Sequence, residues 1–145
     1  DDSIQGLSEA QLNWKLHPNA LSIGEMALHV AGVEISFATQ LTGEVVDAET
    51  QRLVQAATDG AVNDNPFPFS VAEITNERVA AALSLARSKV EPLITNPDPY
   101  RSKEIKSALG PIIDGTGAFA RLGYHPGYHQ AQVYLTRSAP GFPSC

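Results

Sequence analysis

A long amphipathic helix in the first third of the sequence is the feature that most constrains how this chain folds. Ser22 and Glu25 have the capping-box spacing, with a hydroxyl at the cap and a carboxylate three residues later, and Gly43 follows the last apolar position. Between them, apolar residues recur at steps of three and four: Ile23, Met26, Val30, Val33, Phe37 and Leu41. The sequence therefore predicts a helix over 22–43 whose apolar face packs against other helices.

Two further helices are predicted in the middle of the chain. Residues 45–58 are a weaker helical candidate, and the Pro- and Asn-containing segment 59–69 after them is a loop. A long helix follows, for which either Ser70 or Thr75 is a suitable cap. Its apolar stripe consists of Val79, Ala82, Leu83, Ala86, Val90 and Leu93.

Both ends of the chain also favour helices. A short helical turn is expected near Ser8, and a last helix over about 110–137. One face of that helix carries Ala118, Leu122, His125, His129 and Gln132. No segment shows the period-two alternation of strands between turns. We therefore expect an all-α bundle, with residues 1–145 forming one domain.

Composition and charge exclude several classes of protein. The 145 residues include 16 acidic and 10 basic ones, for a net charge of −6, and no basic run stands out, so a nucleic-acid partner is not expected. No apolar run approaches the roughly 18 residues that a membrane-spanning helix needs. The N-terminus lacks a signal-peptide layout, and we expect a cytoplasmic protein. Cys145 is the sole cysteine, which excludes an intramolecular disulfide, and we interpret it as a chain end rather than a reactive thiol.

Three of the four histidines are placed so that they could meet. His125 and His129 are four residues apart, so on a helix their rings lie one above the other and can reach one ion at about 2.0–2.1 Å. His29 lies beside the apolar face of the first long helix, from which it could supply a third ligand. Two alternatives remain: a solvated surface pair at 125 and 129, and a hydrogen-bonded core histidine at 29.

Pro126 lies inside the histidine pair and disfavours a regular helix there. A proline within a helix clashes with the carbonyl four residues earlier, which here belongs to Leu122. We expect either a kink or a new helix start with Pro126 in its first turn. Both alternatives keep His125 and His129 about one turn apart.

Three motifs resemble one known family. The stretch Ser22–Ala31 (SIGEMALHVA) is similar to the second helix of the DinB/YfiT-like family. His125–Gln132 (HPGYHQAQ) resembles that family's last-helix motif, His-x-x-x-His-x-x-Gln, and Leu7–Trp14 (LSEAQLNW) resembles the link between its first two helices. The resemblance covers both ends of the chain, whereas residues 45–70 are unspecific.

The resemblance implies a DinB-like four-helix bundle with up-down-down-up connectivity. It also implies a three-histidine site for nickel, zinc or a similar ion, with His29, His125 and His129 as ligands, and frequent homodimers. Characterised relatives include metal-dependent transferases that use small thiols, and an isomerase. In this family a long helix normally precedes the Leu-Ser-Glu-x-Gln-Leu segment, whereas only six residues precede Leu7 here. We expect that the first helix is short or omitted from the chain, the alternative being that a partner covers the exposed face.

The residues around the histidines allow more than one role. Glu25 could orient His29 or handle protons, or it could only complete the capping box. Gln132 could line the site or be an ordinary polar contact, and Tyr124 and Tyr128 could shape a pocket or belong to the core. Arg137 could bind an anion, although a basic residue is also expected in the last turn of a helix.

Three classes of function follow from these residues. Three histidines without a thiolate suit Zn or Ni rather than Mg or Ca, and such a site leaves positions for a substrate. The first class is a metal-dependent enzyme that acts on a small molecule, either a transferase, with or without a thiol co-substrate, or a hydrolase. The second is a non-catalytic metal- or ligand-binding bundle. The third is a dimerisation module with incidental histidines.

Overall fold

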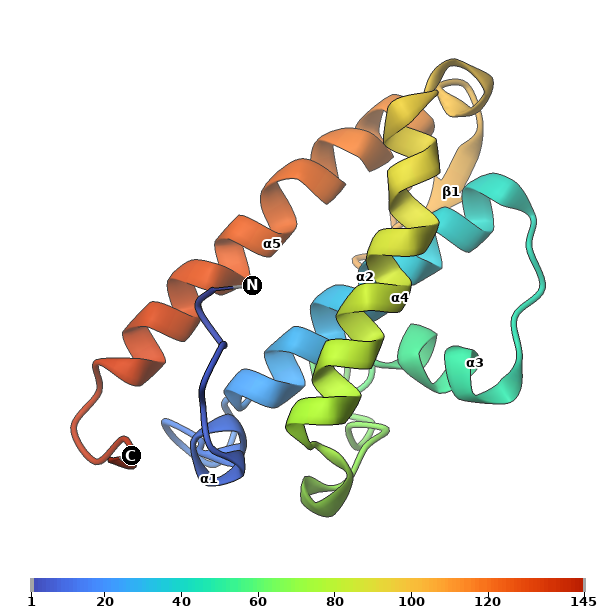
Figure 1. Ribbon diagram of the computed structural model, residues 1–145. Coiled ribbons are helices and arrows are strands. Elements are labelled where there is room, and N and C mark those ends of the chain that lie inside the picture. Colours follow the sequence, from blue (N-terminus) through green and yellow to red (C-terminus); the bar gives the residue numbers. More distant parts are fainter. Residues whose placement is uncertain (1, 145) are drawn as a thin grey trace.

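The structure, a computed structural model, describes residues 2–144 and is mostly helical (Figure 1). Its long helices are accompanied by two short helices, two 3-10 turns and one small sheet. In chain order the elements are α1 (Glu9–Asn13), α2 (Ile23–Thr42), α3 (Ala48–Gln55), η1 (Val71–Glu73), α4 (Asn76–Thr95), η2 (Asp98–Tyr100), β1 (Glu104–Lys106), β2 (Ile112–Asp114) and α5 (Gly115–Arg137).

Helix α2 is the centre of the fold, and its predicted ends are confirmed. The Ser22 hydroxyl accepts a hydrogen bond from the Glu25 amide, and the Glu25 carboxylate accepts one from the Ser22 amide, which completes the capping box. Gly43 ends the helix with a positive φ of 77°, a conformation that favours glycine. Phe37 and Leu41 are only 1% and 0% exposed, and burial of side chains of this size contributes about 1.5–3 kcal/mol each.

Both alternative caps before the second long helix are used. Ser70 and Glu73 form a capping box around the 3-10 turn η1, and Thr75 then caps α4 through the Arg78 amide. The two starts are therefore successive rather than exclusive. The predicted weaker helix is shorter than expected, because Asp47 caps α3.

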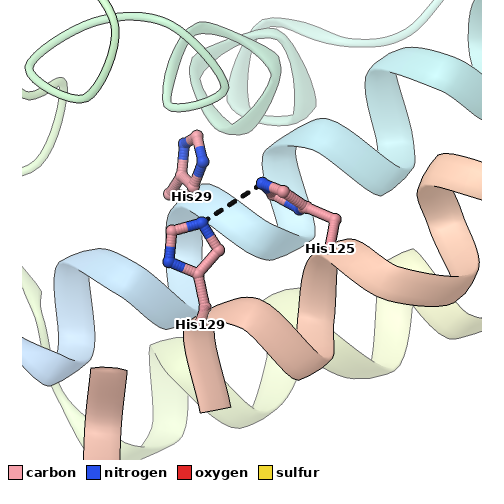
Figure 2. A group of neighbouring side chains, drawn as sticks. All are labelled: His29, His125 and His129. Atoms are coloured by element: carbon pink, nitrogen blue, oxygen red, sulfur yellow. Dashed lines mark hydrogen bonds between the residues drawn. The ribbon is translucent and has the colours of Figure 1, made fainter. Parts of the chain in front are cut away.

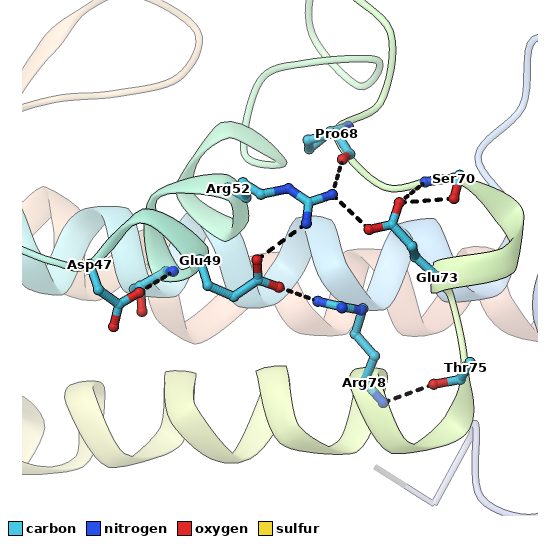
Figure 3. A network of polar contacts seen from close by, with 9 residues as sticks. Asp47, Glu49, Arg52, Pro68, Ser70, Glu73, Thr75 and Arg78 are labelled. Atoms are coloured by element: carbon cyan, nitrogen blue, oxygen red, sulfur yellow. Dashed lines mark hydrogen bonds and ion pairs between the residues drawn. The ribbon is translucent and has the colours of Figure 1, made fainter.

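A network of ion pairs holds α3, η1 and α4 together (Figure 3). Arg52 donates to Glu49 at 3.2 Å and to Glu73 at 2.9 Å, and it also reaches the Pro68 carbonyl at 2.9 Å. Arg78 bridges to the other oxygen of Glu49 from the first turns of α4. We call these four charged side chains, Glu49, Arg52, Glu73 and Arg78, the Arg–Glu network.

The expectation that the chain has no strands is wrong between α4 and α5. Strands β1 and β2 pair antiparallel, with Ile105 opposite Ile113, and Gly110 turns the chain between them at a φ of 105°. Each strand has three residues, too few to show the alternation by which a strand is recognised in sequence. Because the hairpin occupies residues 104–114, α5 begins at Gly115 with Asp114 as its cap, later than expected.

The other two long helices, α4 and α5, both pack against α2. One part of the core joins α2 to α3 and α4, and includes Leu28, Ile35 and Ala86. A second part joins the C-terminal half of α2 to the hairpin, the end of α4 and the start of α5. Figure 1 shows α4 and α5 approaching each other at that end, while the N-terminal segment lies between them at the other.

The structure therefore confirms a mostly helical fold and corrects its details. Within residues 2–144 there are three long helices and no fourth one. None of the helices within this range combines the length and the apolar character that crossing a membrane requires. The interpretation of Cys145 concerns a residue outside the described part of the chain.

Candidate metal centre

Three histidine side chains from two helices meet at one point (Figure 2). His29 extends from α2, and His125 and His129 extend from successive turns of α5. One nitrogen from each ring lies within 4.8 Å of the others, and the three residues are 5–7% exposed. The burial of His125 and His129 excludes the solvated surface pair that the sequence left open. His29 is a hydrogen-bonded core histidine, as the other alternative stated, and it also faces the other two rings.

The orientation of His29 depends on the end of α3. Its Nδ1–H donates to the Ala56 carbonyl at 2.9 Å, one of the carbonyls that a helix end leaves without an intrahelical partner. Gly32, one turn further along α2, makes this approach possible. A Cβ at Gly32 would lie 2.2 Å from the Leu53 carbonyl oxygen, a distance that no side chain tolerates. The bond directs the other nitrogen of His29, Nε2, away from α3.

On α5, the spacing of four places the two remaining rings side by side. Their Nε2 atoms are 3.2 Å apart. The helix continues through Pro126, so the predicted new helix start is not observed. Pro126 lacks the N–H that would bond to the Leu122 carbonyl, but the residues on either side keep helical geometry.

Burial keeps the three imidazoles in the neutral form that binds metals. Desolvation and repulsion by His129, His29 and Arg121 lower the pKa of His125 from 6.5 to about 3. Desolvation and repulsion by His29 lower the pKa of His129 to about 4, although the nearby Gln132 amide opposes this. Desolvation also lowers the pKa of His29, against the bond to Ala56. At neutral pH each ring therefore has one unprotonated nitrogen.

The polar atoms of the site are only partly satisfied. The Nδ1 atoms of His125 and His129 are buried and have no hydrogen-bond partner within residues 2–144. His29 alone has the outer hydrogen bond that commonly fixes the ring of a ligating histidine. The site is thus preorganised on α2 and less constrained on α5.

The histidines line a cleft of about 690 Å³. This volume is within the range of small-molecule sites. Its other walls come from the loop after α1, the turn after α3, the hairpin and α5. They are formed by Leu16, His17, Asn19, Ala20, Leu21, Met26, Ala61, Val62, Leu109, Arg121, Tyr124, Tyr128, Gln132, Leu135 and Thr136.

The two other residues predicted for the site occupy different positions. The Glu25 carboxylate bonds to the Ser22 amide and pairs with Lys15 at 2.8 Å, and it is not among the residues that line the cleft. The partner of His29 is Ala56 instead. Gln132 does line the cleft, where its amide donates to the Tyr128 hydroxyl at 3.1 Å.

Sequence reasoning missed several residues around the histidines. Arg121 is four residues before His125, so its place on the same helix face could have been read from the spacing. Tyr124 and Tyr128 were not missed: of the two roles left open for them, the structure agrees with the pocket, since both are 58% exposed and line the cleft. No local pattern marks Ala56 as the partner of His29, because the contact joins residues 27 positions apart.

Comparisons of the chain with protein-family models, with curated proteins and with solved structures found no match. A function can therefore be inferred only from the geometry of the site.

The donor set and its spacing fit a divalent transition-metal ion. Two nitrogens that bind one ion at about 2.0–2.1 Å, at ligand angles between about 90° and 110°, are roughly 2.9–3.4 Å apart. The 3.2 Å between the Nε2 atoms of His125 and His129 lies in this range. Buried neutral imidazoles favour ions such as Zn²⁺ or Ni²⁺ over Mg²⁺ or Ca²⁺, which prefer oxygen. The three histidines could therefore hold a metal ion.

Proposed function

We propose that this chain is a DinB-like, metal-dependent helical protein that acts on a small molecule. His29, His125 and His129 hold one divalent ion, Zn²⁺ or Ni²⁺, at the wall of the cleft. The activity is a transferase or hydrolase reaction, with a small thiol as a possible co-substrate class. The observation that carries the proposal is the convergence of three buried imidazoles on the wall of a 690 Å³ cleft.

The surroundings of the histidines support a reactive rather than a structural site. Structural zinc sites are usually closed by four protein ligands, whereas catalytic sites have three and retain room for a substrate. Within residues 2–144 the group holds three such side chains and no fourth. The adjoining cleft gives a small molecule access to them.

Each residue of the proposed site has a definite task. The Ala56 carbonyl fixes the ring of His29, and α5 presents the other two rings. A divalent ion bound by three neutral imidazoles supplies Lewis acidity to a substrate atom beside it. Tyr124, Tyr128 and the leucines of the cleft bind the apolar part of the substrate and exclude water from it.

Metal analysis of the purified protein tests the proposal directly. We expect one Zn²⁺ or Ni²⁺ per chain after equilibration and dialysis, and a loss of at least a hundredfold in affinity in His129→Ala, because a two-histidine remainder is a weak ligand set. His17→Ala is the control, since His17 lies at the exposed edge of the same cleft. Equal metal content in His129→Ala and the wild type would refute the site.

Assays on the loaded protein then separate an enzyme from a binding protein. Thiol conjugation and ester or amide hydrolysis should be measured with a panel of small electrophiles and compared with His129→Ala. Activity in the wild type that His129→Ala loses would support the enzyme. A protein that binds metal but gives no turnover above the variant on any substrate would support the non-catalytic binding bundle instead.

A further inference from the structure

The charged residues of the cleft are unevenly distributed. Its lining includes one arginine, Arg121, and no aspartate, glutamate or lysine. The chain as a whole has 16 acidic and 10 basic residues. The acidic side chains of residues 2–144 lie outside the cleft, whereas Arg121 lines it together with the histidines.

Arg121 has no acidic partner in the described part of the chain. Within residues 2–144 no ion pair or hydrogen bond engages its guanidinium, whose Cζ lies 6.0 Å from the centroid of the Tyr124 ring. By contrast, Arg101 pairs with Asp98, and Arg52 and Arg78 pair with glutamates. An arginine at the edge of an apolar cleft retains its full capacity to bind an anion when no carboxylate occupies it.

The position of Arg121 relates it to the histidines. It precedes His125 by four residues and His129 by eight, so the three side chains follow one face of α5. It also lines the same cleft as the three imidazoles. A ligand held by Arg121 would therefore extend along α5 toward the three imidazoles.

We propose that Arg121 binds the carboxylate of a small organic acid whose apolar body lies against Tyr124 and Tyr128. This inference rests on the proposed function in one respect, since it takes the acid to be the substrate of the metal site. A single guanidinium matches one carboxylate with two parallel hydrogen bonds. Without the metal ion, Arg121 is the one arginine or lysine of the lining, so the metal-free cleft matches a carboxylate better than a phosphate dianion. The aromatic and leucine surfaces select an acid with a ring or short chain rather than a polar one.

The charges in the cleft also favour an anionic ligand. Three neutral imidazoles leave the charge of a divalent ion uncompensated, and Arg121 adds a further positive charge to the same cleft. With no carboxylate in the lining to balance them, these charges attract an anionic ligand and exclude a cationic one.

Benzoate and its neutral isostere benzamide test the inference by calorimetry at pH 7.5. The metal-free protein is used first, because a metal ion could itself bind the carboxylate. We expect benzoate to bind more tightly than benzamide, and Arg121→Gln to weaken benzoate binding by roughly tenfold to a hundredfold, the range for a hydrogen bond to a charged group. Arg121→Lys should recover part of the loss, since it keeps the charge without the planar fork.

Controls separate this inference from the metal proposal. Arg101→Gln removes the same charge from an exposed position outside the cleft and should leave benzoate binding unchanged. Metal content should be equal in Arg121→Gln and the wild type. Equal benzoate affinity in these two proteins would overturn the inference while leaving the metal site intact. Arg121-dependent benzoate binding in a protein that takes up no metal on equilibration with Zn²⁺ or Ni²⁺ would support the anion site and refute the metal proposal.

Discussion

The Arg–Glu network connects α3, η1 and α4, whereas the histidine site connects α2 and α5, and polar groups are paired in the first region but only partly satisfied in the second (Figures 2 and 3). In the network, two arginines share Glu49, and each also stacks over the Phe69 ring, at 4.5 and 5.0 Å from its centroid. In the site, two ring nitrogens are buried without a partner and Arg121 has no acid beside it.

The Arg–Glu network stabilises the fold, whereas the histidine site has groups that can bind a ligand. Paired charges that are partly exposed add a small amount to stability and have little capacity left for a ligand. The Nε2 atoms of His125 and His129 face each other, and a metal ion that binds them only in the folded state would stabilise that state. Substitutions in the histidine site should therefore change how much metal raises the free energy of unfolding. Substitutions in the Arg–Glu network should leave that rise unchanged.

Metal saturation should give the largest effect. At a free Zn²⁺ concentration a thousand times the dissociation constant, the free energy of unfolding should rise by about 4.1 kcal/mol. Urea denaturation with and without metal measures this rise. His129→Ala should show little of it, whereas Glu49→Gln should show all of it. An equal rise in wild type and His129→Ala would mean that metal binds elsewhere.

Gly32→Ala should give the next largest effect, because it acts on the support of His29. The new Cβ would lie 2.2 Å from the Leu53 carbonyl oxygen, and forcing α3 away costs about 1–3 kcal/mol. Displacement of the Ala56 carbonyl should also weaken metal binding by roughly tenfold or more. Gly127→Ala, whose Cβ would meet nothing within 4 Å, is the matched control and should be neutral or stabilising.

Acidification should destabilise the metal-free protein through the histidines. The pKa of His125 falls to about 3 and that of His129 to about 4 in the folded state, below 6.5 in the unfolded chain. As pH drops below 6.5, the unfolded state therefore binds protons that the folded state excludes, and stability decreases by at most about 1.4 kcal/mol per histidine for each pH unit. Urea midpoints between pH 7 and 5.5 should change less in the His125→Gln/His129→Gln double variant. Parallel curves would contradict the burial of the rings.

Glu49→Gln should give the smallest effect. Partly exposed ion pairs contribute about 0.2–1 kcal/mol, and Glu49 is half-exposed. The bonds from Arg78 and Arg52 lower the pKa of Glu49, so the contribution is present above pH 4.5 and is lost as pH falls through the lowered value. Glu91→Gln, an exposed change on α4, controls for net charge. A change in metal affinity in Glu49→Gln would contradict the independence of the two regions.

Much of the helical fold could be predicted from residues that are neighbours in the sequence. Ser22, Gly43 and Thr75 end or begin helices by bonds within one turn, so their roles follow from local spacing. The β1–β2 hairpin could not be predicted, because its short strands are stabilised by burial of Ile105 against a distant part of the core. Homodimerisation, the cytoplasmic location and the DinB-like connectivity remain predictions.

The sequence alone was enough to select His29, His125 and His129 as candidate metal ligands. The spacing of four on α5 fixes two rings on one face, and the apolar pattern of α2 places His29 toward the interior. Only the tertiary structure decided that the rings meet, that Ala56 orients one of them and that Arg121 opens onto the same cleft without an acid beside it. Local spacing sets direction along one helix, whereas convergence and charge balance depend on which distant segments pack together.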